Sequence, residues 1–291
     1  MSTPSFRKAT REKVFLKLAI TGPSGSGKTY SALRMARGLV GPTGKIALID
    51  TENGSASLYA DRFDFDTLDI APPFENDKFV QGIDAAVAAG YQAIIIDSAS
   101  HFWEGILDYK SQLDSRGGNS YTNWKTAGDK FSGIIKAVLQ SPVHIICCMR
   151  SKMDYVQEKD ERGKTTVRKV GLAPIMRDGI EYEFTTVFDV ALDHRVSVSK
   201  DRSGLFVDKI FQVTEDTGKL LEEWRLSGGE PAYKPKLEAA LKVDEVNSNL
   251  FLVKLGWIKE GQTFRDLNRD HAEKILNNVG GFITKANASA P

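Results

Sequence analysis

The segment Gly22-Pro23-Ser24-Gly25-Ser26-Gly27-Lys28-Thr29 matches the pattern G-x-x-x-x-G-K-[ST] at every fixed position. An apolar run, residues 16–21, precedes it, and the residues that follow, 30–39, have helical spacing. Glycines let a loop between a strand and a helix wrap closely around phosphate groups. The phosphate charge is attracted by successive backbone N–H groups and by the N-terminus of the helix. The sequence therefore predicts a phosphate-binding loop (P-loop) that binds ATP together with Mg²⁺.

Three side chains carry the chemistry of this predicted site. Lys28 can reach the β- and γ-phosphates as a compact cation, and the Thr29 hydroxyl can bind the magnesium ion. Asp97 follows the apolar residues 93–96 and can hold the ion through a water molecule at the carboxyl edge of a sheet. The alternative for Asp97 is a cap on the next helix. The predicted nucleotide contacts are Gly22, Pro23, Ser24, Gly25, Ser26, Gly27, Lys28, Thr29 and Tyr30.

Apolar runs alternate with helical patterns over the first part of the chain. Residues 45–50, 93–97 and 143–149 are predicted strands, and residues 78–89 and 126–139 are predicted helices. Near-continuous apolar strands separated by helices are typical of a parallel sheet that is covered on both faces. The sequence predicts an α/β fold with a mainly parallel central sheet flanked by helices.

The pattern changes after Arg150. Residues 153–170 carry a turn signal at 160–163, which predicts a ribbon or a long loop. A glycine- and proline-containing linker at 228–231 separates an expected ATP-binding core, residues 1–228, from a small helical module, residues 229–291. Further strands are expected at 185–192, 195–199 and 210–213, and the helices of the module at 236–242, 248–255 and 270–277.

Composition limits the possible functions. The 291 residues are 41% hydrophobic and 26% charged, which indicates a folded globular protein. The formal net charge of +1 means that any binding of nucleic acid must use a local patch. No apolar run approaches the length of a membrane span, so we expect no membrane partner and a cytoplasmic location. The adjacent Cys147 and Cys148 should point to opposite faces of a strand, and no cysteine–histidine spacing indicates zinc.

The segment Ala47-Leu48-Ile49-Asp50-Thr51-Glu52 is an apolar strand that ends in Asp-x-Glu. After a P-loop helix, this arrangement resembles RecA-like recombinases and their phage relatives, including AAA-type phage ATP-binding proteins. The resemblance covers about the first 225 residues and implies a RecA-like P-loop NTPase core. It also implies that Glu52 polarises the water that attacks the γ-phosphate. A phage-encoded protein of this type would act in the host cytoplasm.

The segment Ser199-Lys200-Asp201-Arg202-Ser203-Gly204 is similar to the Lys-Asn-Arg-x-Gly motif of RadA and of ring helicases built on the RecA core. In those proteins the cation reaches the nucleotide of a neighbouring subunit. The resemblance implies that Lys200 and Arg202 are catalytic cations acting across a homo-oligomer, as a ring or a filament. Asp201 departs from the motif's asparagine, and the alternative is an ordinary basic turn between two strands.

RecA-like proteins contact single-stranded DNA through loops after the third and fourth strands. The matching segments here are residues 110–125 and 150–169, where aromatic side chains can stack on bases and cations can meet phosphates. The alternative is a pair of solvated loops in which Trp124 anchors a helix start. The candidate DNA contacts are Arg116, Tyr121, Trp124, Lys125, Arg150, Lys152, Arg162, Lys164 and Arg168, and Arg150 is also placed to sense the γ-phosphate.

These observations lead to one main functional hypothesis and two others. The main hypothesis is a Mg²⁺-dependent, RecA-like ATPase that binds single-stranded DNA in phage recombination, repair or annealing. The second is a nucleotide-switched module that loads or regulates a replication partner and hydrolyses ATP slowly. The third, a small-molecule kinase, ranks last because the sequence shows no acceptor-substrate lid.

Overall fold

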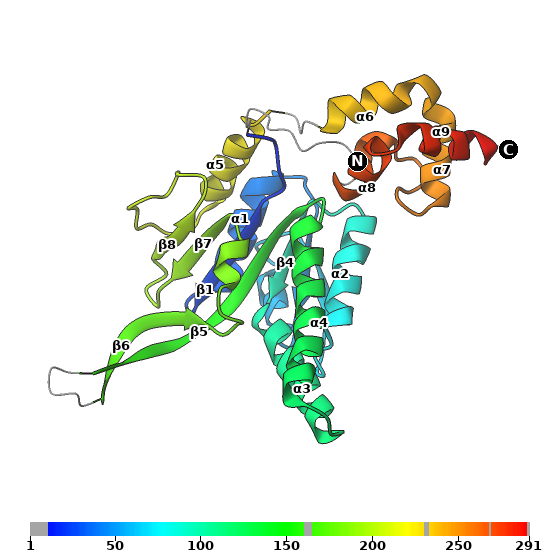
Figure 1. Ribbon diagram of the computed structural model, residues 1–291. Coiled ribbons are helices and arrows are strands. Elements are labelled where there is room, and N and C mark those ends of the chain that lie inside the picture. The colour runs from blue at the N-terminus through cyan, green and yellow to red at the C-terminus, as the bar shows by residue number, and fades with distance from the viewer. Residues whose placement is uncertain (1–10, 160–164, 230–232, 268, 290–291) are drawn as a thin grey trace. The chain divides into compact units, whose positions relative to one another are not determined.

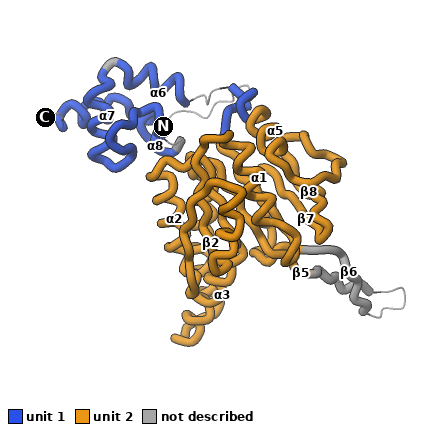
Figure 2. Tube along the Cα trace, turned by 180° about the vertical axis from the view of Figure 1, so that it is seen from behind, with its two compact units in different colours: residues 1–14, 225–291 blue, residues 15–224 orange. Residues whose placement is uncertain are grey.

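The computed structural model describes residues 11–159, 165–229, 233–267 and 269–289, with the side chains of 153–172 left out of the description. The chain divides into two compact units, Phe15–Trp224 and a second one formed by Arg225–Pro291 together with Met1–Val14 (Figure 2). In the second unit, the backbone N–H of Lys13 donates to the carbonyl of Gly229 at 2.7 Å. The division falls at 224/225, whereas the linker predicted 228/229, and residues 1–14 group with the smaller unit and not with the expected core.

The larger unit is built on a mainly parallel sheet, which confirms the predicted α/β class (Figure 1). The strand order is β3-β2-β4-β5-β1-β7-β8, and β6 pairs with β5 outside this row. All neighbours from β3 to β7 are parallel, whereas β8 is antiparallel to β7 and β6 to β5. The strands are β1 (Lys17–Gly22), β2 (Ile46–Asp50), β3 (Asp66–Asp69), β4 (Ala93–Asp97), β5 (His144–Lys159), β6 (Thr165–Pro174), β7 (Thr186–Val190) and β8 (Val196–Asp201).

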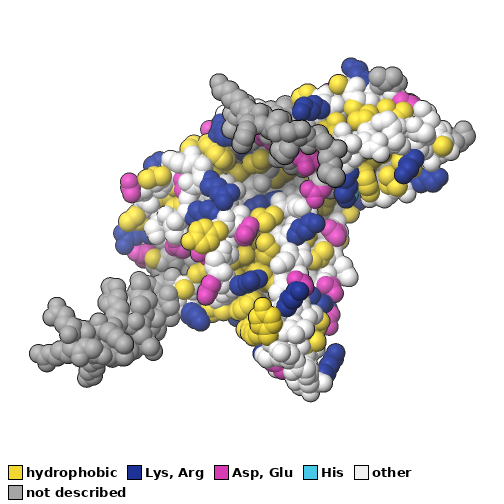
Figure 3. All heavy atoms as spheres, viewed as in Figure 1, with side chains coloured by type: hydrophobic (Ala, Val, Ile, Leu, Met, Phe, Trp, Pro, Cys, Tyr) yellow, Lys and Arg dark blue, Asp and Glu magenta, His cyan; other side chains and the backbone are white. Residues whose placement is uncertain are grey.

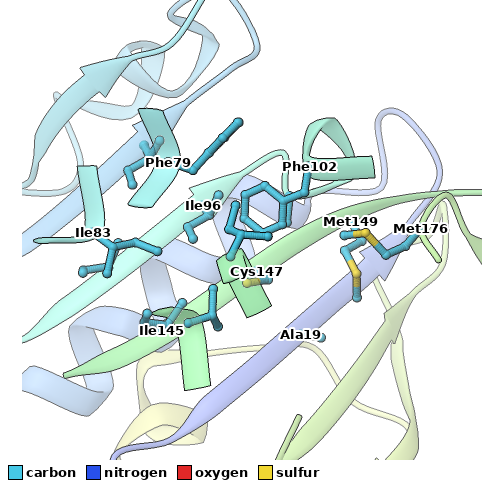
Figure 4. Close-up of a cluster of buried hydrophobic side chains, with 14 of the residues drawn as sticks. Ala19, Phe79, Ile83, Ile96, Phe102, Ile145, Cys147, Met149 and Met176 are labelled. Carbon is cyan, nitrogen blue, oxygen red and sulfur yellow. The ribbon is translucent and has the colours of Figure 1, made fainter. Parts of the chain in front are cut away.

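Helices cover both faces of this sheet, because the side chains of its central strands are apolar on both faces. On one face α2, α3 and α4 pack against alternate strand residues in a cluster that includes Phe79, Phe102, Ile96 and Ile145 (Figure 4). On the other face α1 and α5 pack against the intervening residues. The helices are α1 (Lys28–Val40), α2 (Asn76–Ala88), α3 (Ser100–Ser115), α4 (Ser120–Gln140) and α5 (Glu215–Leu226), with 3₁₀ turns η1 (Ser55–Tyr59) and η2 (Ile180–Glu183).

The two cysteines follow this two-sided pattern. Cys147 belongs to the cluster under α2–α4, and Cys148 belongs to the cluster under α1 and α5. Both thiols are free and buried, as expected for adjacent residues on a strand. Burial raises the pKa of Cys147 to about 12, so this thiol stays protonated and packs as a small apolar side chain.

The smaller unit has its own apolar core. Leu237, Leu252, Phe264, Ile275 and Phe282 are among its buried side chains. Three of its helices agree with the sequence prediction within a few residues. Its elements are α6 (Tyr233–Leu241), η3 (Lys242–Asp244), α7 (Glu245–Lys254), η4 (Phe264–Asp266), α8 (Arg269–Leu276) and α9 (Val279–Ala288). None of the described helices in either unit is both long enough and apolar enough to cross a bilayer.

The structure corrects two sequence expectations. Residues 210–213 do not form a strand, and only an isolated bridge joins Phe211 to Val196. The Asp201 carboxylate accepts hydrogen bonds from the backbone N–H groups of Ser203 and Phe206, which turns the chain away from β8. Residues 110–125 are not a loop but the end of α3 and the start of α4, joined by residues 116–119. Sequence reasoning also missed β3, α3, α5 and α9.

Candidate functional site

The P-loop joins the end of β1 to the start of α1. Gly25 and Gly27 have φ values of 78° and 87°, a left-handed conformation that favours glycine. A Cβ on Gly22 would lie 2.6 Å from both the Ser26 Oγ and the Val190 carbonyl, so the loop also requires glycine where it leaves the sheet. The Lys28 Nζ lies over the loop and donates to the Pro23 carbonyl at 2.9 Å. The local backbone therefore has the strand–loop–helix form that the motif predicted.

Thr29 and Asp97 meet beside the P-loop. The Thr29 hydroxyl donates a hydrogen bond to the Asp97 carboxylate, which stands at the end of β4 and is 3% exposed. Burial raises the pKa of Asp97 to about 6, and the hydrogen bond from Thr29 opposes this rise. A hydroxyl and a carboxylate next to a phosphate-binding loop are oxygen ligands of the kind that Mg²⁺ prefers. This pair of residues fits the predicted metal.

Glu52 follows β2, the strand adjacent to β4. Its backbone N–H donates to one oxygen of Asp50 at 2.6 Å, and the N–H of Ala56 donates to the other at 3.1 Å. Asp50 thus holds the turn that presents Glu52. The Glu52 Oε1 accepts a hydrogen bond of 2.8 Å from the Nε of Arg150, which extends from β5. This hydrogen bond raises the pKa of Arg150.

These groups surround one cavity of about 500 Å³. It brings together most of the predicted P-loop contacts with Glu52, Asp97 and Arg150, although Gly22, Pro23 and Ser26 do not line it. Its lining residues are Ser24, Gly25, Gly27, Lys28, Thr29, Tyr30, Ser31, Arg34, Glu52, Tyr59, Arg62, Asp97, Arg150, His194, Gln212 and Val213.

Comparison with known protein families agrees with this geometry. The family described as AAA domain matches residues 15–231, which span the whole of the larger unit. The chain belongs to the AAA domain family. A search of the curated proteins finds no match. Membership indicates a nucleotide-binding ATPase of the P-loop class, and such proteins typically bind the nucleotide with Mg²⁺.

Several residues that line the P-loop cavity were missed by sequence reasoning. His194 lies in the turn between β7 and β8, and its Nδ1 is 2.9 Å from the Ser26 carbonyl of the P-loop. Tyr59 ends η1, and Gln212 precedes α5. These residues are distant in sequence from the motif and have no recognisable spacing to it. Only the packing of β7, β8 and η1 around the loop brings them to the cavity.

Lys200 and Arg202 lie elsewhere in the AAA domain. The Lys200 Nζ donates to the carbonyls of Glu181 and Tyr182 at 2.9 and 2.5 Å, and Arg202 donates to the Tyr182 carbonyl at 3.1 Å. Both cations therefore hold η2 within their own chain, and neither lines the P-loop cavity. Because these contacts describe a single chain, the role across an interface stays a prediction.

Three candidate DNA contacts converge on a second cavity. Tyr121, Trp124 and Lys125, all in the first turns of α4, line a cavity of about 370 Å³. The other lining residues are Trp103, Ile106, Gly128 and Arg177. The rings of Trp103 and Trp124 are stacked with centroids 6.1 Å apart. In this region of α4, Figure 3 shows hydrophobic side chains next to Lys and Arg side chains.

The remaining DNA candidates are dispersed. Arg116 caps the end of α3 outside the second cavity, and Lys152 is exposed where β5 leaves the sheet. Arg162 and Lys164 lie outside the described residues. Arg168 is in β6, paired with Val156 of β5, and its side chain is not described. The ribbon expected at 153–170 is present as the β5–β6 hairpin.

Proposed function

We propose that this protein is a Mg²⁺-dependent ATPase of RecA-like type whose turnover is coupled to single-stranded DNA. The convergence of Lys28, Thr29, Asp97 and Glu52 on one cavity carries the proposal. Lys28 and Thr29 belong to the P-loop segment, and Glu52 and Asp97 stand at the ends of the adjacent strands β2 and β4, which pair at Asp50 and Asp97. Each residue has the chemistry that one part of phosphoryl transfer to water requires.

In this mechanism Lys28 turns from the Pro23 carbonyl to the β- and γ-phosphates of ATP. Glu52 accepts a proton from the attacking water, as a general base does. Arg150 must leave Glu52 for this to happen, and the γ-phosphate is the charge that draws its guanidinium away. Thr29 and Asp97 are the residues that would hold Mg²⁺, which neutralises charge on the phosphates when bound.

The second cavity supports the nucleic-acid half of the proposal. Tyr121 is 82% exposed and Trp124 42% exposed, unusual values for large aromatic side chains. Lys125 and Arg177 place positive charge at the same cavity. Aromatic platforms flanked by cations bind single strands because each base can stack and each phosphate can pair. The formal net charge of the chain is only +1, so this local arrangement must supply the affinity for DNA.

The decisive experiment measures ATP hydrolysis with and without oligo(dT), with the oligomeric state recorded by light scattering in the same samples. We expect Mg²⁺-dependent hydrolysis that oligo(dT) accelerates and that Lys28→Ala abolishes. Hydrolysis that oligo(dT) leaves unchanged removes the coupling to DNA. Tight ATP binding without turnover in either condition removes the ATPase and leaves a nucleotide switch.

The Glu52–Arg150 ion pair favours that nucleotide switch as the second candidate. A general base held at 2.8 Å by a guanidinium is not free to activate water. A protein that keeps this pair with ATP bound would hydrolyse slowly and signal its bound state to a partner. Arg150→Met distinguishes the two, because it should accelerate hydrolysis only if Arg150 restrains Glu52 in the ATP-bound state.

A further inference from the structure

A hydrogen-bond junction joins the strand ends that carry the two carboxylates of the nucleotide site. Thr51 directly precedes Glu52, and Ser98 directly follows Asp97. The backbone N–H of Thr51 donates to the Asp97 carbonyl at 2.7 Å. The N–H of Ser98 donates in return to the Thr51 Oγ1 at 2.7 Å. The Thr51 side chain therefore links the end of β2 to the end of β4.

His101 completes this junction from the first turn of α3. Its Nδ1 lies 2.6 Å from the Thr51 Oγ1, and its ring is 4% exposed. The ring stacks on Phe74 with centroids 4.1 Å apart and planes 1° apart. Burial, and secondly the charge of Arg150, lowers the pKa of His101, so the imidazole is neutral at neutral pH.

The hydrogen count allows two directions for the bond between Thr51 and His101. A threonine hydroxyl has one proton to donate and can accept from other donors. Ser98 N–H uses one acceptor position, and the Thr51 proton can go to His101 Nδ1 at 2.6 Å or to the Ser98 carbonyl at 3.3 Å. If the hydroxyl donates to Nδ1, the imidazole N–H is on Nε2, 3.7 Å from the Glu104 carboxylate. If Nδ1 carries the proton, it donates to Thr51 Oγ1 and the hydroxyl donates to the Ser98 carbonyl. The Thr51–His101 bond is present in both arrangements.

We propose that His101 is a positioning residue for ATP hydrolysis: by fixing the Thr51 hydroxyl, it sets where Glu52 stands relative to Asp97. The inference rests on the proposed function, because it concerns the hydrolysis step of the same site. His101 touches neither carboxylate, and the P-loop cavity does not include it. His101 acts on Glu52 through the hydroxyl of Thr51, the residue that directly precedes Glu52.

A residue of this kind should affect kcat and spare nucleotide binding. Lys28 and the P-loop backbone bind the phosphates, and neither contacts the junction. A general base displaced by a fraction of an ångström loses alignment with the water, and a misplacement of about 1 Å can cost about a hundredfold in rate. We expect about a tenfold loss in kcat when the Thr51–His101 bond is removed, with KM for ATP unchanged.

Two substitutions separate the hydrogen bond from the ring packing. His101→Phe keeps an aromatic ring against Phe74 and removes Nδ1, so kcat should fall about tenfold. His101→Asn loses the ring but places an amide group near the position of Nδ1, so it should recover most of the rate. Thr51→Val removes this bond together with the one from the Ser98 N–H, so its loss should be at least as large. The double variant Thr51→Val/His101→Phe should be no slower than Thr51→Val, because the bond to His101 is already absent there.

The controls are chosen to separate outcomes. His271→Phe removes a histidine that stacks on Trp257 in the smaller unit, and it should leave kcat unchanged. ATP affinity by titration calorimetry and the melting temperature are measured for every variant. If His101→Phe does not fold, Thr51→Val and His101→Asn carry the same comparison.

Three results decide between this proposal and the proposed function. If His101→Phe turns over at the wild-type rate, or if His101→Asn is as slow as His101→Phe, the positioning role is wrong. If the losses in kcat simply follow losses in melting temperature or ATP affinity, His101 is only a packing residue. If the wild-type protein binds ATP and does not hydrolyse it, the proposed ATPase fails first, and this is visible before any variant is made.

Discussion

Lys17 provides a prediction whose magnitude can be worked out from its surroundings. It lies in the buried strand β1, with its side chain 5% exposed, and its Nζ donates to the carbonyls of Ser141 and Val143 at 2.8 and 2.5 Å. Burial lowers the pKa of Lys17 from its usual value of 10.5 to about 7. Between these two pKa values the unfolded chain binds a proton at Lys17 that the folded protein lacks. The free energy of unfolding must therefore rise with pH in this window.

The size of this effect follows from linkage. Each unit of pKa difference corresponds to about 1.4 kcal/mol, so the full effect approaches 5 kcal/mol. From pH 7 to pH 8.5 the folded protein loses its remaining Lys17 charge, and stability should increase by about 1.5 kcal/mol. Below pH 7 the folded and unfolded states are both protonated, and the dependence should disappear. Lys17→Met removes the titrating group and keeps a side chain of similar length.

The assay is urea unfolding at several pH values between 7 and 8.5, for the wild type and Lys17→Met. Both should carry Trp257→Phe, so that Trp103, Trp124 and Trp224 report on the larger unit alone. Both cysteine thiols begin to ionise in the unfolded chain toward pH 8.5, but they do so equally in the two proteins, so the difference between the two pH dependences isolates Lys17. The quantity compared is the change in stability with pH, because the variant also loses two hydrogen bonds. Equal pH dependence in the two proteins would refute the argument.

Four further predictions concern the nucleotide site and its partners. Lys28→Ala should abolish tight ATP binding in titration calorimetry, since the main cation facing the phosphates is lost; unchanged affinity would remove the P-loop assignment. Glu52→Gln should keep ATP binding and slow hydrolysis at least about tenfold in a phosphate-release assay, and a wild-type rate would exclude Glu52 as the base. Lys200→Ala combined with Arg202→Ala should spare ATP binding but reduce turnover of the assembly, by up to about a thousandfold. Mixing this variant with Lys28→Ala should restore some activity, and failure to do so in proven mixed assemblies would confine both cations to their own chain. Tyr121→Ala should weaken oligo(dT) binding, measured by fluorescence anisotropy, at least about fivefold, whereas Tyr182, which is also largely exposed at 70%, should tolerate the same change.

The sequence by itself determined the strand–loop–helix of the nucleotide site and the class of the fold. These features are local: the P-loop pattern is contiguous, and the buried strands 93–97 and 143–149 appear as uninterrupted apolar runs. Asp97 was also accessible, because it stands directly after such a run at the carboxyl edge of the sheet. Glu52 was indicated by the resemblance of the Asp-x-Glu strand end to RecA-like proteins. The opposite facing of Cys147 and Cys148 follows from the two-residue period of a strand.

The tertiary structure alone decided which distant residues join the site. His194, Tyr59 and Gln212 reach the P-loop cavity through the packing of separate elements, which no local pattern records. The connection between α3 and α4 was taken for a loop because Gly117 and Gly118 dominate the local signal, whereas Asn119, which directly follows them, caps α4 with its side chain. The hydrogen bond between His101 and Thr51 joins residues 50 positions apart, and the bond between Arg150 and Glu52 joins residues 98 positions apart. Both bonds therefore depend on the order of the strands in the sheet. Local sequence determines the elements, and long-range packing determines which side chains meet.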